Sequence, residues 1–161
     1  MMRAAGLVPI ACVLAGCAAT MPAETAPAPM APTPQQIVAA RQAAFHMSGA
    51  AMGNMRAAIE RDADPKSQAY AARAVARWAQ ALPTLFPDVT RVVTPTRARP
   101  EIWSNKTDFE AKAAAYAAAA ERLAEAAASG DKAAFAEQHR ATVATCKACH
   151  DLYQAPQNRG G

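Results

Sequence analysis

The sequence predicts an all-α protein, an antiparallel four-helix bundle, on three observations. First, 52% of its residues are hydrophobic but only 6% are aromatic, and the excess is alanine, the residue with the highest intrinsic helix propensity. Second, four segments repeat apolar residues at three- and four-residue steps. Third, two of the three junctions between them are short turns and one is a longer crossover. The β-branched runs that would indicate a mainly β protein are absent.

The chain begins with an apolar leader typical of export. Arg3 supplies a positive charge, an apolar run extends to Leu14, and small residues close it. The run is too short to span a bilayer as a permanent helix. Positions 14–17 read Leu-Ala-Gly-Cys and resemble the bacterial lipobox. We therefore predict a lipoprotein signal peptide over residues 1–16 and lipidation of Cys17; the alternative is an ordinary cleaved signal that leaves a soluble periplasmic protein.

A tether rich in proline and alanine is predicted over residues 17–34, because repeated prolines exclude a regular helix. The bundle domain is predicted over residues 35–156 and a C-terminal tail over 157–161. The first helix is expected to start at Thr33 or Pro34 and to end near Arg61. Its two neighbouring stripes are Ile37, Ala40, Ala44, Met47, Ala51, Met55 and Ile59, and Arg41, Phe45, Ser48 and Met52.

The second helix is expected between Pro65 and Ala81, with Ala71, Ala74, Val75 and Trp78 toward the core. The connection over residues 83–103 contains four prolines and is long for a compact domain. We expect it to cover part of the structure as well as to join two helices.

The third and fourth helices meet at a short turn. The third is expected over residues 105–128, with apolar residues at heptad-like spacing. Gly130 follows as a C′ residue, and Asp131 is the N-cap of the fourth helix. The apolar stripe of the fourth helix leads into a cysteine motif near the C-terminus.

That motif is Cys146-Lys147-Ala148-Cys149-His150, whose C-x-x-C-H spacing is typical of c-type haem attachment. On a helix, Cys149 and His150 lie three and four positions after Cys146, so all three side chains project from one face. The alternatives are a redox-active C-x-x-C pair, half of a zinc site and a chance match. A redox pair would need a thioredoxin-like βαβ pattern, and a zinc site would need a second ligand pair; neither is found.

The remaining composition excludes other classes. The net charge of +4 comes from 17 basic and 13 acidic residues that are scattered without a basic run, so no nucleic-acid partner is predicted. No Ser/His/Asp set or paired carboxylates indicate an active site, and we expect no enzyme. Cys12 leaves with the signal, Cys17 carries lipid, and the last two cysteines carry haem, so no disulfide is expected.

Four stretches resemble the cytochrome c prime family, the class II c-type cytochromes. They are Arg-Gln-Ala-Ala-Phe at 41–45, which lacks a tyrosine of the family pattern, Ala-Leu-Pro at 81–83, Arg-Pro-Glu-Ile-Trp-Ser at 99–104, and the cysteine motif extended to Tyr153. The resemblance covers residues 35–153. It implies a four-helix bundle with one covalent haem c, thioethers at Cys146 and Cys149, and His150 as the proximal iron ligand.

The resemblance also assigns residues of the first helix. Arg41 and Gln42 match a pair that contacts the haem propionates, a role that suits a guanidinium. Phe45 matches the position where low-spin relatives carry a ligating methionine and five-coordinate relatives carry an apolar residue. Because phenylalanine has no lone pair, the resemblance implies five-coordinate iron open to NO and CO. The side chains that would overturn this are Met47, Met52, His46 and His139.

Two functions follow from the resemblance, periplasmic electron transfer with other redox proteins and binding of small gases. A six-coordinate electron-transfer cytochrome and a structural lipoprotein with an incidental motif are the alternatives. Members are often homodimers through the first helix, where Met55 and Ile59 are the candidate contacts. The family often has a basic residue four positions after the haem histidine, and this chain has Gln154 there.

Overall fold

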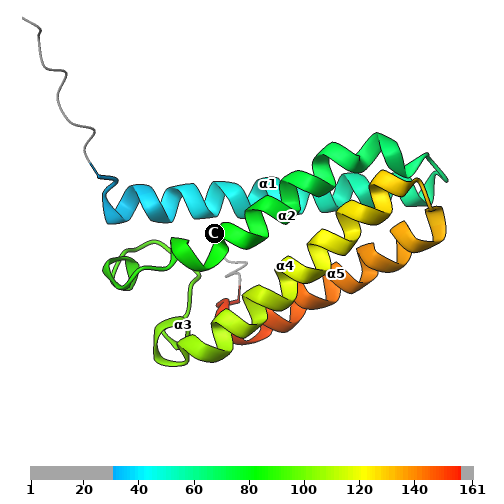
Figure 1. Ribbon diagram of the computed structural model, residues 1–161. Coiled ribbons are helices and arrows are strands. Elements are labelled where there is room, and N and C mark those ends of the chain that lie inside the picture. The colour runs from blue at the N-terminus through cyan, green and yellow to red at the C-terminus, as the bar shows by residue number, and fades with distance from the viewer. Residues whose placement is uncertain (1–30, 157–161) are drawn as a thin grey trace, which may run out of the picture. The chain divides into compact units, whose positions relative to one another are not determined.

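A computed structural model describes residues 31–156 (Figure 1). The predicted signal peptide, Cys17, most of the tether and the tail over 157–161 lie outside the described residues and stay predictions. Among the described residues, no helix has an apolar stretch long enough to cross a bilayer.

The first helix, α1, spans Pro34–Glu60, as predicted. Thr33 and Gln36 form a capping box, in which each side chain accepts a hydrogen bond from the other residue's backbone N–H, at 3.2 Å and 2.7 Å. Arg41 and Met52 of one predicted stripe and Met55 of the other are buried, while Phe45 and Ser48 are partly buried. Ala40 and Met47 are exposed, the latter by 72%, so their assignment to the core was wrong. They lie on the side of α1 that faces away from the rest of the bundle.

The second helix, α2, spans Ala69–Ala81 and follows a single 3₁₀ turn, η1, at Pro65–Gln68. Its end at Ala81 is confirmed. Its buried face is rotated from the predicted one, since Ala72, Val75, Ala76 and Ala79 are buried. Ala74 is exposed, so its predicted core position was wrong. The rotation arises because α2 packs most closely against α4, where only small side chains fit.

The crossover holds two 3₁₀ turns, η2 at Leu82–Leu85 and η3 at Asp88–Thr90, and the one-turn helix α3 at Glu101–Ser104. The helices α4, at Lys106–Ser129, and α5, at Lys132–Tyr153, confirm the last two predicted helices. Between them Gly130 has φ of +82°, a conformation that favours glycine. Asp131 caps α5 by accepting a hydrogen bond from Ala134 N at 2.9 Å.

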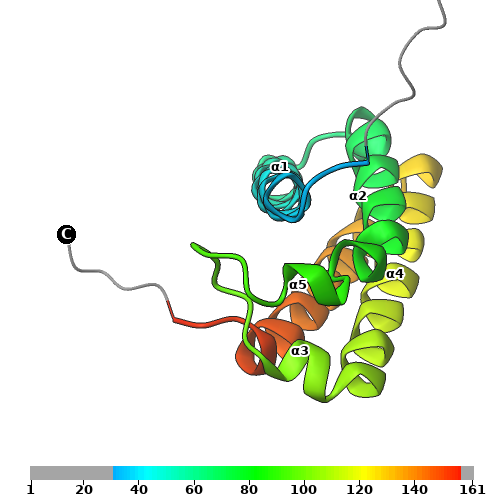
Figure 2. The same ribbon diagram turned by 90° about the vertical axis from the view of Figure 1, so that its left-hand side faces the viewer.

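The four long helices run alternately up and down (Figure 1), which confirms the predicted antiparallel four-helix bundle. The closest packing is between α2 and α4 and between α4 and α5. Figure 2, seen along the helices, shows α1 set apart from α4 and α5. The core consists of many buried alanines around a few large side chains, among them Met55, Leu123 and Phe135.

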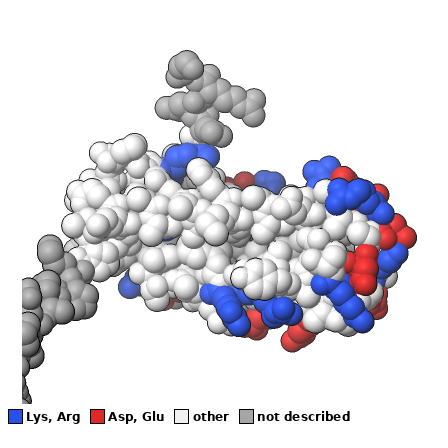
Figure 3. Space-filling model, turned by 90° about the horizontal axis from the view of Figure 1, so that it is seen from above, with Lys and Arg blue, Asp and Glu red and all other residues white. Residues whose placement is uncertain are grey.

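Charged side chains are distributed unevenly over the surface. On the face shown in Figure 3, lysine, arginine, aspartate and glutamate gather toward one end. From Pro34 to Asn54 the only charged residue of α1 is Arg41, and it is buried. The first half of α1 therefore presents an uncharged surface.

Because alanine contributes little apolar area, the few large core side chains should dominate stability. Replacing Phe135, which is 2% exposed, with alanine (F135A) should lower the free energy of unfolding by about 3–5 kcal/mol. Urea unfolding of the haem-loaded protein measures this. Tyr70, which is 81% exposed, is the control, and Y70A should change the value by less than about 0.5 kcal/mol. Similar losses for both variants would contradict this description of the core.

Candidate functional site

A cavity of about 690 Å³ lies between α1, the crossover, α4 and α5. Its walls are largely apolar and include Phe45, Met52, Leu82, Phe86, Ile102 and Phe109. The crossover contributes residues 96–98, so the long connection does cover part of the structure, as predicted. The volume is within the range typical of sites for organic cofactors.

The cysteine motif forms one edge of this cavity. Cys146, Cys149 and His150 all line it from the last two turns of α5. Both cysteines are free and half-buried. Burial raises the pKa of each thiol, so both are protonated at neutral pH. Their reaction with a vinyl group therefore depends on their placement and not on spontaneous ionisation.

His150 lies at the exposed mouth of the cavity. Partial burial, together with the positive charge of Arg97, lowers the pKa of its imidazole, and the carboxylate of Asp151 opposes this. The neutral imidazole is the form with a free lone pair, so this environment favours the metal-ligating state.

Phe45 reaches into the cavity from α1, toward His150. The centroids of the two rings are 6.4 Å apart, in an edge-on arrangement. A second edge-on contact, at 5.2 Å, joins Phe45 to Trp78 of α2. Aromatic contacts on both sides hold the Phe45 ring in place across from the histidine.

Arg41 is 2% exposed and binds the crossover. Its guanidinium donates hydrogen bonds to the Leu85 carbonyl at 3.2 Å, to Thr90 Oγ1 at 3.0 Å and to Thr96 Oγ1 at 3.2 Å. It also lies 4.4 Å from the centroid of the Phe86 ring. Burial lowers the pKa of Arg41, but an arginine stays charged at neutral pH. Arg41 lines the cavity as expected of a haem contact, while both terminal nitrogens already donate to the protein.

Gln42 also holds the crossover, because its Nε2 donates to the Pro95 carbonyl at 3.2 Å. It is exposed and lines the cavity next to Arg41. The predicted pair of Arg41 and Gln42 therefore lies at the site. Both side chains also donate hydrogen bonds to the crossover, a role that the sequence did not indicate.

The charges around the cavity are of one sign. Arg41, Arg97 and Lys112 line it, and no aspartate or glutamate does. A haem has broad apolar faces, two vinyl groups and two propionates. The apolar walls match the faces, the two cysteines match the vinyl groups, the neutral histidine matches the iron, and the positive potential of the cavity suits the propionates, so the residues present fit a covalently attached haem. Among the described residues, no cluster of three or more His, Cys, Asp or Glu side chains could hold a metal ion by itself.

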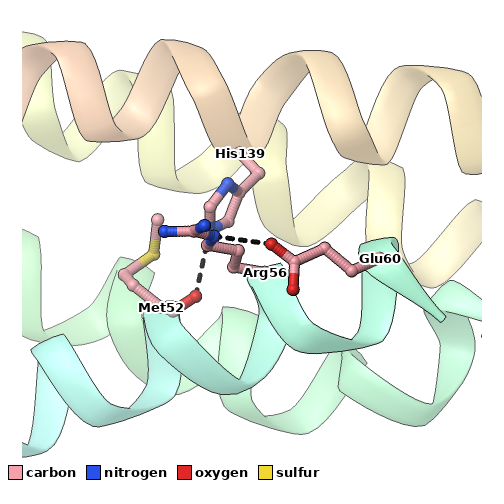
Figure 4. A network of polar contacts seen from close by, with 4 residues as sticks. All are labelled: Met52, Arg56, Glu60 and His139. Carbon is pink, nitrogen blue, oxygen red and sulfur yellow. Dashed lines mark hydrogen bonds and ion pairs between the residues drawn. The ribbon is translucent and has the colours of Figure 1, made fainter.

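The candidate sixth ligands are placed differently from one another. Met47 points to solvent. Met52 and His46 line the cavity, but neither makes the ring contact across it that Phe45 makes with His150. His139 is 7% exposed and its Nε2 lies 3.0 Å from the Met52 carbonyl oxygen, beside the ion pair of Arg56 with Glu60 (Figure 4). It packs α5 against α1 and does not line the large cavity, which agrees with the prediction that it packs.

Three residues of the site were not predicted from the sequence. Arg97 and Lys112 line the cavity, as does Tyr116, whose hydroxyl lies 3.0 Å from Ser48 Oγ and whose pKa burial raises to about 12. The one signal for Tyr116 was Ser48, a hydroxyl residue on a predicted stripe of α1 that would need a polar partner such as the Tyr116 hydroxyl. For Arg97 there was no signal, since its place depends on the path of the crossover.

Comparison with known proteins places this architecture among haem proteins. The family model described as Cytochrome C′ matches residues 36–154. The cytochrome c′ of Pararhodospirillum photometricum is 37% identical over 83 residues, which cover 52% of this chain and 66% of that relative, just under two thirds of its length.

Two solved structures show the same fold. The cytochrome c′ from Thermochromatium tepidum is 32% identical, with a TM-score of 0.73, and the match covers 78% of this chain and 98% of that one. A nitric oxide complex of a cytochrome c prime variant from Alcaligenes xylosoxidans is 27% identical, with a TM-score of 0.70, and the match covers 77% and 98% of the two chains.

The hydrogen bonds of Arg41 give a prediction about stability. Replacing Arg41 with glutamine (R41Q) should lower the free energy of unfolding by about 2–4 kcal/mol, because Thr90, Thr96 and the Leu85 carbonyl lose a charged donor. Hydrogen exchange in residues 85–96 should speed up in the same variant. The control is R56Q, which breaks an exposed i,i+4 ion pair and should cost less than about 0.5 kcal/mol. Unchanged exchange in the crossover of R41Q would contradict the role of Arg41.

Proposed function

The chain belongs to the cytochrome c′ family, whose members carry one covalent haem c, and from this premise we propose that it binds small neutral gases at a five-coordinate haem. We propose His150 as the proximal ligand and the Phe45 side as the position where the gas enters. The nitric oxide complex of the Alcaligenes xylosoxidans relative supports the proposal that the bound ligand is a small gas.

The residues of α5 hold the cofactor. Cys146 Sγ and Cys149 Sγ would each form a thioether bond, and the His150 imidazole would donate its lone pair to the iron. The haem would supply an iron atom that changes oxidation state by one electron and can bind a small ligand. Because the three side chains come from consecutive turns of one helix, they fix the orientation of the cofactor against the apolar walls.

The observation that carries the proposal is the position of Phe45. Its ring comes from the opposite wall of the cavity to His150, contacts the imidazole edge-on at 6.4 Å between centroids, and has no atom that can donate a lone pair to a metal. A water or an anion there would lie against an apolar ring with no hydrogen-bond partner from it, which is unfavourable. A diatomic molecule such as NO or CO is small and nearly apolar, so this side selects for it.

Electron transfer is the second candidate function, and the exposure of the motif favours it. His150 is exposed, and Leu152 beside it is 47% exposed. An electron could therefore pass between this edge and a redox protein docked on the end of α5. Both functions are compatible with one site, and we propose neither an enzymatic reaction nor a nucleic-acid partner.

We further propose that the protein works in the periplasm, anchored through lipid on Cys17, with release as a soluble protein as the alternative. A homodimer through the uncharged outer face of α1 is part of the proposal. Met55 is wholly buried, so its predicted place in such a contact was wrong, and exposed Met47 is the better candidate. Ile59 is partly buried and remains available at the edge.

Absorption spectra test the coordination state. The protein is produced with a haem-attachment system, and ferric and ferrous spectra are recorded before and after CO and NO are added. We expect a high-spin ferrous spectrum that shifts with each gas, and haem that stays on the chain in denaturant. The C146S/C149S double variant is the control and should lose its haem under denaturing conditions. A low-spin spectrum indifferent to gas would leave electron transfer, and absence of covalent haem would favour the structural lipoprotein.

Substitution of Phe45 separates the two functions. Methionine at this position (F45M) places a thioether sulfur across from His150, so the ferrous spectrum should become low-spin and CO affinity should fall at least about tenfold, or about 1.4 kcal/mol. Leucine (F45L) keeps the side apolar, is the matched control, and should retain a high-spin spectrum. If F45M stays high-spin and binds CO like the wild type, Phe45 does not lie opposite the proximal ligand.

A further inference from the structure

The crossover pairs with the end of α5 beside the haem histidine. Ala98 and Gln154 form an isolated antiparallel bridge. Ala155 N donates to the Arg97 carbonyl at 2.8 Å, and Arg99 N donates to the Tyr153 carbonyl at 3.0 Å. These backbone hydrogen bonds fix Arg97 next to the last turn of α5, which carries His150.

The Arg97 side chain is anchored at one nitrogen only. Its Nε donates to the Ala155 carbonyl oxygen at 2.8 Å. Within residues 31–156 its two terminal nitrogens have no hydrogen-bond partner, and the side chain forms no ion pair. It lines the same cavity as His150, and its charge acts on that imidazole. The guanidinium is therefore held near the histidine without being neutralised.

The neighbouring carboxylates are engaged elsewhere. Asp151 forms an ion pair with Lys147 at 2.6 Å, on the exposed side of α5. Asp108 accepts a hydrogen bond from the Tyr153 hydroxyl at 2.6 Å and lies 3.8 Å from Lys112. Gln154, which also lines the cavity, is uncharged. Arg97 is thus a positive charge at the His150 side that forms no ion pair with a carboxylate of the described residues.

We propose that Arg97 is a positioning residue for the electrostatics of the haem site, and that its fixed positive charge favours ferrous over ferric iron. This rests on the proposed His150-ligated haem. The step is the gain of one electron from an external one-electron donor, with no bond broken and no proton moved. Reduction lowers the charge of the iron by one, so a nearby positive charge stabilises the reduced state. At a separation of about 10 Å and an effective dielectric constant of about 20–40, one unit charge changes the ferrous-to-ferric ratio roughly four- to seventeenfold.

Redox titration of the haem-loaded protein under inert gas tests the proposal. Replacing Arg97 with glutamine (R97Q) should lower the ferrous-to-ferric ratio at a fixed applied potential by roughly four- to seventeenfold. The matched control is R91Q, which removes an arginine that is exposed like Arg97 and belongs to the same connection, but that does not line the cavity. Its ratio should change by less than about twofold, because solvent screens a distant exposed charge.

Arg97→Lys separates charge from structure. Lysine keeps the charge but lacks the Nε donor that binds the Ala155 carbonyl, so R97K should stay close to wild type. An R97K titration that matches R97Q would overturn the proposal, because it would assign the effect to the lost hydrogen bond. Equal shifts in R97Q and R91Q, or no shift in R97Q, would overturn it as well.

A second measurement tests the proposal on the wild-type protein, in case R97Q fails to fold. It is the dependence of the ferrous-to-ferric ratio on salt concentration. Raising the ionic strength from about 0.01 M to about 1 M shortens the screening length from about 30 Å to about 3 Å, so the ferrous-to-ferric ratio should fall. A ratio independent of salt would overturn the proposal. These outcomes are separate from the proposed gas binding, because a low-spin wild type would refute an open sixth position and still give a measurable shift in R97Q.

Discussion

The hydrogen bonds of the Arg41 guanidinium hold the crossover against α1, and the geometry of the cavity depends on them. Arg41 is buried and reaches Leu85, Thr90 and Thr96, which span most of the long connection. The Gln42 amide adds a bond to the Pro95 carbonyl one step along the helix. Because a buried charged donor is costly to leave without acceptors, the crossover is bound to this position. That position in turn brings residues 96–98 to the cavity wall and aligns them with the end of α5.

The alanine-rich sequence explains why a cofactor belongs to this core. Small side chains allow α2, α4 and α5 to pack closely, but they bury little apolar area per residue. The first helix remains set apart from α4 and α5, and the large apolar side chains that face the cavity, such as Phe86 and Phe109, come from the crossover and α4. A haem in that cavity would give these large apolar side chains a further apolar partner. Cofactor binding and stability are therefore coupled in this protein.

The two sides of the site differ in polarity: the α1 side is apolar, and the α5 side carries an imidazole and a positive charge. On the α1 side, Phe45 is held between Trp78 and His150 and offers only an apolar ring. On the α5 side, a neutral imidazole lies beside a cation that has no carboxylate partner among the described residues. On the two proposals made above, the first side selects small neutral ligands and the second side stabilises ferrous iron. The two sides thus act together.

The sequence by itself determined the helices, their ends and the attachment motif. Thr33, Gly130 and Asp131 act locally at helix ends, and the spacing of Cys146, Cys149 and His150 places them on one helical face whatever the remaining fold. Local rules could not orient α2, where Ala74 proved exposed, because the alanines on its different faces are chemically alike. Only the tertiary structure decided that Arg41 binds the crossover and that Arg97 binds the backbone at the end of α5. Both contacts join residues far apart in the sequence, and their partners are hydroxyl groups and backbone carbonyls that carry no periodic pattern.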